Sequence, residues 1–369
     1  MSKVRLGDVA VEHKETCKNN KNGYPIVGLE HLIPEEITLS NWDEGSDNTF
    51  SKVFRKGNVL FGRRRAYLKK AAVAPFDGIC SGDITVIEAL PDKILPELLP
   101  FIIQNDALFD YAVGKSAGSL SPRVKWEHLQ NYEFELPELS KQKELADILW
   151  AMDETKKSYQ KLIFATDELV KSQFIEMFGM IDVTSLCNMA KVSAGQSSPY
   201  DEEFSATGTP FIKAGDLESL KKRVISENDC NLVDNETIIR RKLKLHGKGT
   251  VLVAKSGMSC LSGHVYALKE PAYIVSHLAC IEPIEGKSTT EYLRWLFITC
   301  GIKDLIKDPS YPSIQLSQLN ELQIPNASYS KQLEFSSFAS QSDKSKFELE
   351  QALSELTATY KRIISDNLG

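Results

Sequence analysis

The sequence has few cysteines, and none in a spacing that suggests chemistry. Its 369 residues include seven cysteines, an odd number, and no Cys-x-x-Cys pair. The six histidines show no metal-ligand spacing on any one predicted element. These patterns argue against a disulfide framework and against a zinc site. We therefore expect a reducing, cytoplasmic environment and no metal ligands.

Long apolar runs are also missing. No run approaches the roughly 20 residues that a membrane span requires, and the first residues, Met1–Arg5, lack the apolar core of a signal peptide. Hydrophobic residues make up 42% and charged residues 25% of the chain, as in ordinary globular proteins. Length and composition together indicate a protein of two domains with no membrane association.

Motifs for catalysis are scarce as well. Gly286-Lys287-Ser288 and Gly114-Lys115-Ser116 both lack the upstream glycine of a phosphate-binding loop. Glu285-Gly286-Lys287 has the acid-x-lysine spacing of some nucleases, but such a tripeptide often arises by chance. No Asn-Pro-Pro-aromatic sequence is present to bind a flipped base for amino methylation. We therefore expect no catalytic residues and no bound cofactor in this chain.

What the sequence does contain is an internal repeat. Leu139-Ser140-Lys141-Gln142 returns 190 residues later as Tyr329-Ser330-Lys331-Gln332, and Gly57-Asn58-Val59-Leu60 has a partner in Gly249-Thr250-Val251-Leu252. Solenoid repeats are far shorter, roughly 20–50 residues. The repeat therefore indicates two copies of one domain-sized unit, with one task performed at two places. The expected segments are 1–138 and 180–327, each globular, followed by helices at 139–179 and 328–369.

Each globular segment mixes short β-like runs with a helical stretch. The helical stretches, Glu97 to Val113 and Thr289 to Ile306, repeat apolar residues at helical spacing. Gly and Pro punctuate the β-like runs, as turns between strands require. We expect an α/β (α+β) fold with a mixed β-sheet in each copy. The expected strands are 25–29, 58–61 and 84–88 in the first copy and 210–213, 250–253 and 278–282 in the second.

Each copy ends in a long polar helix, the first from about Ser140 to Phe178 with neither Gly nor Pro. Apolar and small residues follow three- and four-residue steps in both helices, which suits a helix pair. A helix of 39 residues would extend roughly 58 Å. We expect two long antiparallel coiled-coil helices that separate the globular units with pseudo-twofold symmetry. Two independent amphipathic helices, each on its own domain, are the alternative. The first seam is Leu145, Ile148, Met152, Thr155, Tyr159, Leu162, Thr166 and Leu169.

Charge is unevenly distributed, although the net charge is −6. Residues 51–70 include eight basic residues and no acid, and residues 237–256 include six basic residues and no acid. A solvated charged face is the usual explanation of such a run. Here the absence of acids and the recurrence in both copies favour a surface that binds nucleic acid.

Two loops in each copy could contact DNA: the arginine loop with its counterpart, and the polar loop Ser119–Lys125 with its counterpart Pro309–Gln315. Arg63-Arg64-Arg65 follows a strand-like run, and its counterpart Lys255–Ser259 is less basic. Arginine can bond guanine edges in pairs, while lysine more often holds phosphates. Ser81-Gly82-Asp83 and Ser276-His277 also match, but turn formation explains them at least as well. The candidate DNA-binding residues are Arg63, Arg64, Arg65, Tyr67, Lys69, Lys70, Ser119, Ser121, Arg123, Lys125, Lys213, Lys255, Ser256, Ser259, Tyr311 and Ser313.

Several of these segments resemble one known family. Leu136–Leu145 is similar to the junction between target-recognition domain and conserved helix in specificity subunits of type I restriction-modification enzymes. Gly57–Arg63, Tyr67-Leu68 and Gly78–Gly82 resemble the body of such a domain, and Val4–Ala10 resembles its opening. The resemblance covers essentially the whole chain.

The resemblance implies a non-catalytic subunit with two target-recognition domains, each reading half of a bipartite site in double-stranded DNA. The helices would set the number of unread bases and dock two modification subunits, which bind S-adenosylmethionine and methylate adenine. Restriction motor-nuclease subunits would complete the complex, and ATP and Mg are expected only on partner subunits. Because the candidate contact loops differ, we expect two different half-sites. The partner-binding candidates are Leu145, Ile148, Met152, Tyr159, Leu349 and Leu356.

Two other functions remain open from the sequence. A nuclease or methyltransferase fused to recognition domains would need a cofactor loop or an acidic metal site, and neither is visible. A dimerisation scaffold would use the same helices but bind proteins with its globular units. Binding to duplex DNA that weakens steeply with salt would favour the DNA-binding hypothesis over the scaffold hypothesis.

Overall fold

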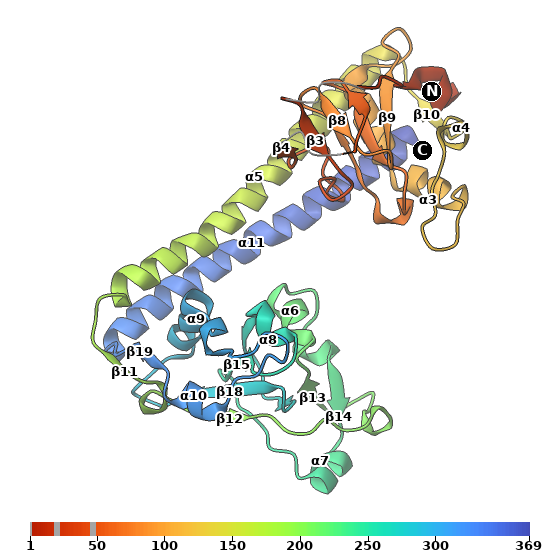
Figure 1. The fold of residues 1–369 in the computed structure, drawn as a ribbon. Coiled ribbons are helices and arrows are strands. Elements are labelled where there is room, and N and C mark those ends of the chain that lie inside the picture. Colours follow the sequence, from red (N-terminus) through yellow and green to blue (C-terminus); the bar gives the residue numbers. More distant parts are fainter. Residues whose placement is uncertain (1, 18–22, 45–48) are drawn as a thin grey trace. The chain divides into compact units, whose positions relative to one another are not determined.

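The computed structural model describes residues 2–17, 23–44 and 49–369, and it divides into two compact units (Figure 1). Unit 1 combines Met1–Lys161 with Glu350–Gly369, and unit 2 is Leu162–Leu349. Each long helix therefore has one half in each unit, whereas the four segments expected from the sequence keep each helix whole. The expected fold class is confirmed, because both units contain mixed β-sheets and helices.

Unit 1 contains two four-stranded sheets in the described residues. The first is antiparallel throughout, whereas the second includes one parallel pair, β3 with β8. In order, the first sheet is β2 (Ala10–Glu12), β9 (Ile84–Ala89), β6 (Val59–Gly62) and β7 (Ala71–Val73). The second is β4 (Asp43–Glu44), β3 (Pro25–Val27), β8 (Gly78–Cys80) and β5 (Lys52–Phe54).

Unit 2 repeats this arrangement. Its first sheet is antiparallel, and β13 pairs in parallel with β17, as β3 does with β8. This shared strand order is the structural counterpart of the sequence repeat. The first sheet is β12 (Ala190–Ala194), β18 (Leu278–Pro283), β15 (Val251–Ala254) and β16 (Val265–Ala267). The second, in the described residues, is β14 (Asn231–Val233), β13 (Thr209–Ile212) and β17 (Tyr273–Ile274).

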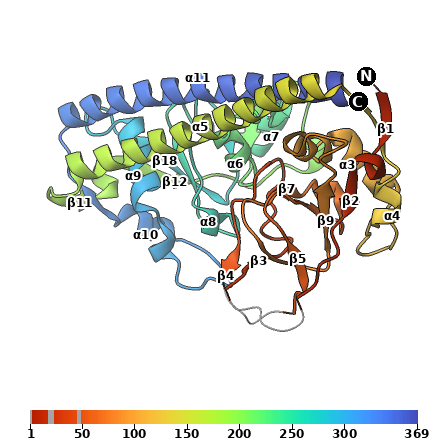
Figure 2. The same ribbon diagram turned by 90° about the horizontal axis from the view of Figure 1, so that it is seen from above.

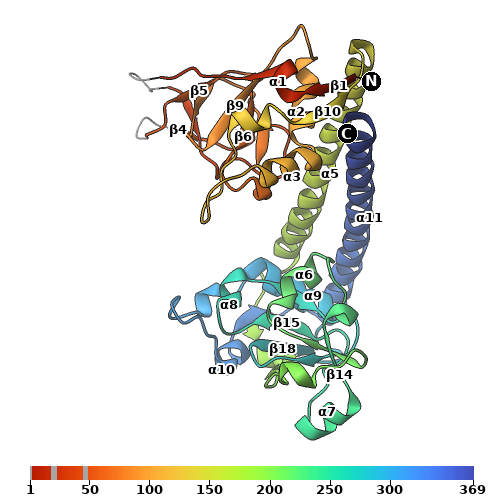
Figure 3. The same cartoon turned by 90° about the vertical axis from the view of Figure 1, so that its right-hand side faces the viewer.

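The central strands are buried on both faces, which explains their continuous apolar sequences. In β6, Val59 and Phe61 enter the core shared with the helices, while Leu60 enters the core shared with the second sheet. Figure 3 shows these layers in unit 1, with β6 and β9 between β4 and β5 on one side and α2 and α5 on the other. In β15, Val253 and Leu252 divide between the two cores of unit 2 in the same way. All six strands expected from the sequence are present.

A short antiparallel ribbon precedes each long helix. In unit 1, β1 (Ser2–Arg5) pairs with β10 (Glu133–Leu136), and Gly369 at the end of the chain lies beside β10. In unit 2, β11 (Val183–Ser185) pairs with β19 (Gln323–Pro325). The first residues of each copy are thus bonded to the strand that leads into that copy's helix.

The long helices are α5 (Leu139–Phe178) and α11 (Tyr329–Leu368), close to the expected bounds. Within unit 1, Leu145 and Leu149 of α5 share a core with Ile364 and Leu368 of α11. Within unit 2, Phe174 and Phe178 of α5 pack on Phe335 of α11. Pairing early residues of one helix with late residues of the other makes the packing antiparallel in each unit (Figure 2).

The expected seam of the first helix is wrong in register at several positions. Leu145 is buried, but Ile148, Leu162 and Leu169 are 44%, 51% and 55% exposed. Leu149 is fully buried instead of Ile148. The helix has to face a sheet domain as well as its partner helix, and a two-helix seam does not account for that second contact.

The shorter helical stretches also differ from expectation: the first is interrupted, and the second ends early. The stretch from Glu97 to Val113 is broken at Asn105, whose backbone is extended. The Asn105 side chain caps α3 by accepting a hydrogen bond from the Ala107 amide at 3.0 Å. The stretch from Thr289 ends at Gly301, whose positive φ of 66° stops the helix. The α-helices are α1 (Leu6–Val9), α2 (Leu99–Ile103), α3 (Asp106–Gly114), α4 (Trp126–Leu129), α6 (Asp216–Lys221), α7 (Asn235–Arg241), α8 (Ser259–Ser262), α9 (Thr290–Cys300) and α10 (Leu316–Asn320).

The repeated Ser-Lys-Gln sequence has a structural reason. Gln142 is buried, accepts a hydrogen bond from the Leu95 amide at 2.8 Å and donates one to the Pro137 carbonyl at 2.8 Å. Gln332 is also buried, accepts from the Thr289 amide at 3.0 Å and donates to the Ala327 and Lys287 carbonyls. In both copies one glutamine thus ties the first turn of the long helix to the start of the shorter helical segment.

Within the described parts of the chain, no helix has an apolar stretch long enough to cross a membrane.

Candidate nucleic-acid interface

The arginine loop of unit 1 lies beside the second loop expected to contact DNA. Arg64 and Arg123 form an isolated antiparallel bridge. The Arg65 amide donates to the Pro122 carbonyl at 2.8 Å, and the Val124 amide donates to the Arg63 carbonyl at 3.0 Å. Backbone hydrogen bonds therefore join two loops that are about 60 residues apart in the sequence.

An acidic side chain lies between the arginines of these loops. Arg123 donates from Nε and Nη2 to the two carboxylate oxygens of Asp83, at 2.7 and 3.2 Å. Nη1 of Arg64 is 3.5 Å from Oδ2 of Asp83, and Nη2 of Arg64 donates to Oγ of Ser121 at 3.0 Å. The hydrogen bond from Arg123, with the nearby charges of Arg123, Arg64 and Arg63, lowers the pKa of the Asp83 carboxyl. The carboxylate is therefore ionised at neutral pH.

The three consecutive arginines have different surroundings. Arg65 is exposed and has a left-handed backbone with φ of 54°. Arg63 and Arg64 are partly buried, and the Nε atom of each is buried without a hydrogen-bond partner. Buried donors without partners are costly, so both side chains keep one unsatisfied N–H below the surface.

Unit 2 has the same backbone frame with different side chains. The Lys255 amide donates to the His277 carbonyl at 2.9 Å, as the Arg63 amide does to the Asp83 carbonyl at 3.0 Å. The bonds Ile314 to Lys255 and Gly257 to Pro312 correspond to those in unit 1, and Ser256 bridges Ser313. In this frame Ser256 takes the place of Arg64, Ser313 that of Arg123, and His277 that of Asp83.

Other candidates lie on or next to these paired loops. Tyr67 follows the arginine loop in a 3₁₀ turn, η1 (Ala66–Leu68), and is 54% exposed. Tyr311 precedes Pro312 and is 83% exposed. Ser119 and Lys125 are exposed on either side of the 121–123 segment, and Ser259 is half-buried at the start of α8.

Three expected lysines are held by other parts of their own unit. Lys69 forms an ion pair with Asp106 at 2.6 Å, and Lys70 donates to the Leu29 carbonyl at 2.6 Å. Nζ of Lys213 lies 4.6 Å from the ring centre of Phe204. The structure therefore does not bring these side chains to the paired loops.

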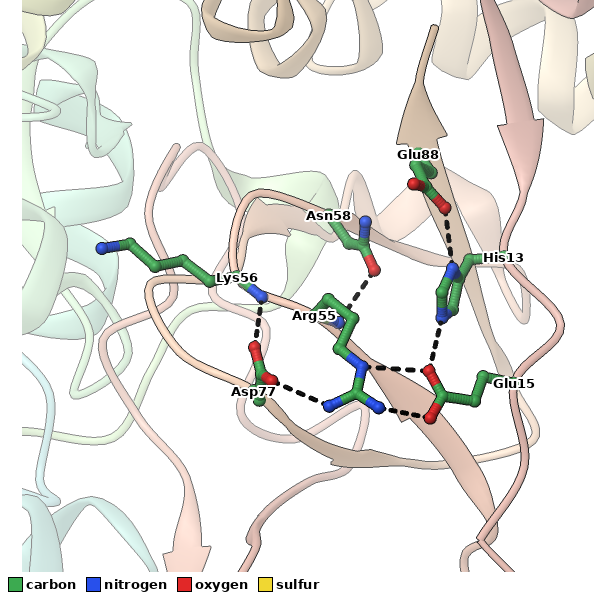
Figure 4. A network of polar contacts seen from close by, with 7 residues as sticks. All are labelled: His13, Glu15, Arg55, Lys56, Asn58, Asp77 and Glu88. Carbon is green, nitrogen blue, oxygen red and sulfur yellow. Dashed lines mark hydrogen bonds and ion pairs between the residues drawn. The ribbon is translucent and has the colours of Figure 1, made fainter.

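The two basic windows are not continuous basic surfaces, contrary to the sequence interpretation. Arg55 forms hydrogen bonds with both Glu15 and Asp77, and His13 joins Glu15 to Glu88 in the same network (Figure 4). In unit 2, Arg240 and Arg241 both pair with Glu203. Acids distant in sequence thus pair with Arg55 in the first window and with Arg240 and Arg241 in the second, and the window alone could not reveal them.

The residues expected to bind partners lie along the long helices. Leu145 packs in the core of unit 1, and Ile148 is the most exposed of the six. Met152, Tyr159, Leu349 and Leu356 are half-buried. None of the described residues forms a cluster of three or more side chains suited to a metal ion.

Asp83 is the residue of the candidate interface that sequence reasoning missed. Ser81-Gly82-Asp83 matched a segment of the second copy, but turn formation explained it equally well. Its contact with Arg123 depends on the pairing of β6 with β9, which places the end of one strand beside the start of the other. The sequence does show an acid directly before a buried strand. Only the pairing of β6 with β9 shows that this acid lies beside the arginine loop.

Comparison with known proteins gives one family for this repeated arrangement. The model of the type I restriction modification DNA specificity domain matches residues 1–163 and 181–357. The type I restriction enzyme MjaIX specificity subunit of Methanocaldococcus jannaschii is 27% identical over 156 residues, which cover 41% of this chain and 35% of that protein. The chain thus spans about a third of the length of this curated relative.

Two solved structures share the fold over nearly the whole chain. The type I restriction-modification system S subunit from M. genitalium has a TM-score of 0.61 at 13% identity, with 98% of this chain and 94% of that chain covered. A chain described under complex assembly and conformational transition of the type I R-M system has a TM-score of 0.60 at 19% identity, with 99% and 97% covered. At these identities the two structures support the fold alone.

Proposed function

The chain belongs to the family of type I restriction modification DNA specificity domains, and on that premise we propose that it selects the DNA target of a type I restriction-modification complex. The observation that carries this proposal is the pair of adjacent loops in each unit, built on one backbone frame. The chain binds double-stranded DNA in the cytoplasm, and catalysis belongs to its partners.

Each unit reads a different half of a bipartite site in this proposal. The frame is repeated, but unit 1 presents Arg64 and Arg123 where unit 2 presents Ser256 and Ser313. Guanidinium groups and hydroxyl groups recognise different base edges. The site is therefore asymmetric, not a palindrome.

The long helices serve assembly in the same proposal. They dock two modification subunits, and their length sets the number of unread bases between the half-sites. The partners carry S-adenosylmethionine, ATP and Mg, and motor-nuclease subunits add restriction to modification. Apolar side chains exposed on α5, such as Ile148, Leu162 and Leu169, support a docking surface along this helix.

Co-expression with a modification subunit, followed by mapping of methylated adenines across a genome, tests the proposal. We expect a split motif with two different halves and a gap of fixed length. A contiguous motif would contradict the proposal that each unit recognises one half of the site. In parallel, binding of the chain with its modification subunits to duplex DNA should weaken steeply with salt, because phosphate contacts release counterions. Salt-independent binding to a protein instead of DNA would favour the scaffold.

A further inference from the structure

Asp83 is an acid at a surface that we assign to DNA, and an acid there repels phosphate. Its side chain is only 22% exposed, because Arg123 and Arg64 lie against it. We propose that Asp83 is a positioning residue: it holds Arg123 so that this arginine reads a guanine in the half-site of unit 1. This inference rests on the proposed function. It names the residue on which the choice of base at one position of the half-site depends.

The geometry of the ion pair leaves Arg123 able to read a base. A guanidinium has five N–H donors in a rigid fork. Arg123 uses Nε and one donor of Nη2 on Asp83, so both donors of Nη1 and the second donor of Nη2 remain. These remaining donors form an end-on fork, the arrangement that bonds O6 and N7 of guanine together. The Arg123 side chain is 42% exposed, which leaves the fork accessible.

Holding the arginine before DNA arrives increases discrimination. A free arginine side chain loses rotamer entropy when it binds, and a charge-assisted, two-point bond to a carboxylate removes much of that loss in advance. It also restricts the directions in which the fork can point. An arginine freed from Asp83 could turn to a neighbouring base or a phosphate, and the preference for guanine would weaken.

The second copy shows that the carboxylate and the arginines occur together. Where unit 1 has Asp83 with Arg64 and Arg123, unit 2 has His277 with Ser256 and Ser313. The backbone bond to residue 83 persists in unit 2 through the His277 carbonyl, so the frame does not need the carboxylate. The carboxylate therefore serves the arginines of unit 1, and its effect belongs to that half-site alone.

Asp83→Asn is the informative variant, because it keeps the size of the side chain and the backbone hydrogen bonds but removes the charge. The matched control is Asp77→Asn, which changes another arginine-paired aspartate of unit 1 away from the paired loops. Each variant is co-expressed with the modification subunit, methylated adenines are mapped, and thermal melting of the purified complex reports folding.

For the wild-type complex we expect a bipartite motif with a guanine in one half. Asp83→Asn should lower discrimination at that base pair by about tenfold or more, the effect of losing one paired arginine contact. The other half-site should be unchanged, and Asp77→Asn should leave the whole motif unchanged. Arg123→Ala should relax the same base pair, and the double variant should relax it no further, because Asp83 acts through Arg123.

Several outcomes would overturn the inference. An unchanged motif in Asp83→Asn, or a uniform loss of methylation with the motif preserved, would show that the carboxylate does not control base choice. If Asp83→Asn fails to fold, Arg123→Gln decides, since a glutamine amide has no guanidinium fork and pairs with adenine edges instead. Retained guanine preference in Arg123→Gln would contradict the proposal. A wild-type complex without any bipartite motif would overturn the proposed function and this inference together.

Discussion

Gln142 and Gln332 show how single residues hold the two copies in the same shape. Each uses its amide oxygen and amide nitrogen on backbone groups from two different segments. The side chains are 2% and 0% exposed, so no water can replace these bonds. The residues that recur between the copies thus serve the frame, whereas the residues of the paired loops differ.

Gln142→Ala should destabilise unit 1 by about 1–3 kcal/mol, because it leaves the Leu95 amide and the Pro137 carbonyl without partners. Urea unfolding of the purified chain measures this change. Lys141→Ala is the matched control, since Lys141 is exposed on the same helical turn. Equal stabilities of the two variants would show that the glutamine is not an anchor.

The network around Arg55 makes a pH-dependent contribution to stability (Figure 4). The hydrogen bond from Arg55 lowers the pKa of Glu15, and the Lys56 amide and Arg55 lower that of Asp77. A carboxyl with a lowered folded pKa stabilises the fold above its unfolded pKa of about 4. That stabilisation is lost as the pH falls through the lower, folded value.

Arg55→Ala should therefore reduce stability at neutral pH and make it less sensitive to acid below about pH 4. Urea midpoints measured over a pH series give this dependence. In Lys56→Ala the acid dependence should match the wild type, because Asp77 accepts from the backbone amide of Lys56 and not from its side chain. Parallel pH curves for Arg55→Ala and wild type would exclude the network as the cause.

At the scale of elements, α5 has to satisfy two contacts with one apolar face. Leu149 is fully buried in the core of unit 1, while its neighbour Ile148 is 44% exposed. Trp150, next along, stacks edge-on against Phe101 of α2. The buried face of α5 therefore turns toward the sheet domain as well as toward α11.

This packing predicts different costs for adjacent substitutions. Leu149→Ala should destabilise the protein by about 2–5 kcal/mol, the usual cost of a large-to-small change in a core. Ile148→Ala should cost far less, since the side chain already contacts solvent. Thermal or urea unfolding compares the two. A larger loss of stability in Ile148→Ala than in Leu149→Ala would support the helix seam expected from the sequence.

The sequence predicts elements of this fold better than their contacts. Continuous apolar runs such as Val59–Phe61 predict strands buried on both faces, and the absence of Gly and Pro from 140–178 predicts one long helix. The Asn105 cap needs a local backbone geometry that periodicity does not report. The pairing of Arg55 with Glu15 and Asp77, and of Arg123 with Asp83, joins residues from different strands, so no window of sequence contains it.

At the scale of the whole molecule, the long helices offer a direct test of the proposed spacing role. Inserting four residues at corresponding positions in α5 and α11 adds roughly 6 Å to each helix and keeps nearly one full turn. We expect the gap of the methylated motif to lengthen by about two base pairs, with both half-sites unchanged, because adjacent base pairs are about 3.4 Å apart. Methylome mapping reads the gap.

Substitution of four helix residues without changing helix length is the control for that experiment. It should reduce stability at most and leave the gap alone. An unchanged gap in the insertion variant, with both half-sites still recognised, would refute the spacing role.

The two compact units also differ in when each can fold during translation. Unit 2 is one continuous segment, Leu162–Leu349, whereas the core of unit 1 includes Ile364 and Leu368 from the last turns of α11. A ribosome adds about 5–20 residues per second, so the remaining 200 or so residues take roughly 10–40 seconds after the first part of unit 1 has emerged. The unit that is translated first is therefore completed last. Until the final turns of α11 arrive, the apolar surface of unit 1 that packs on Ile364 and Leu368 stays open to chaperones and to other nascent chains.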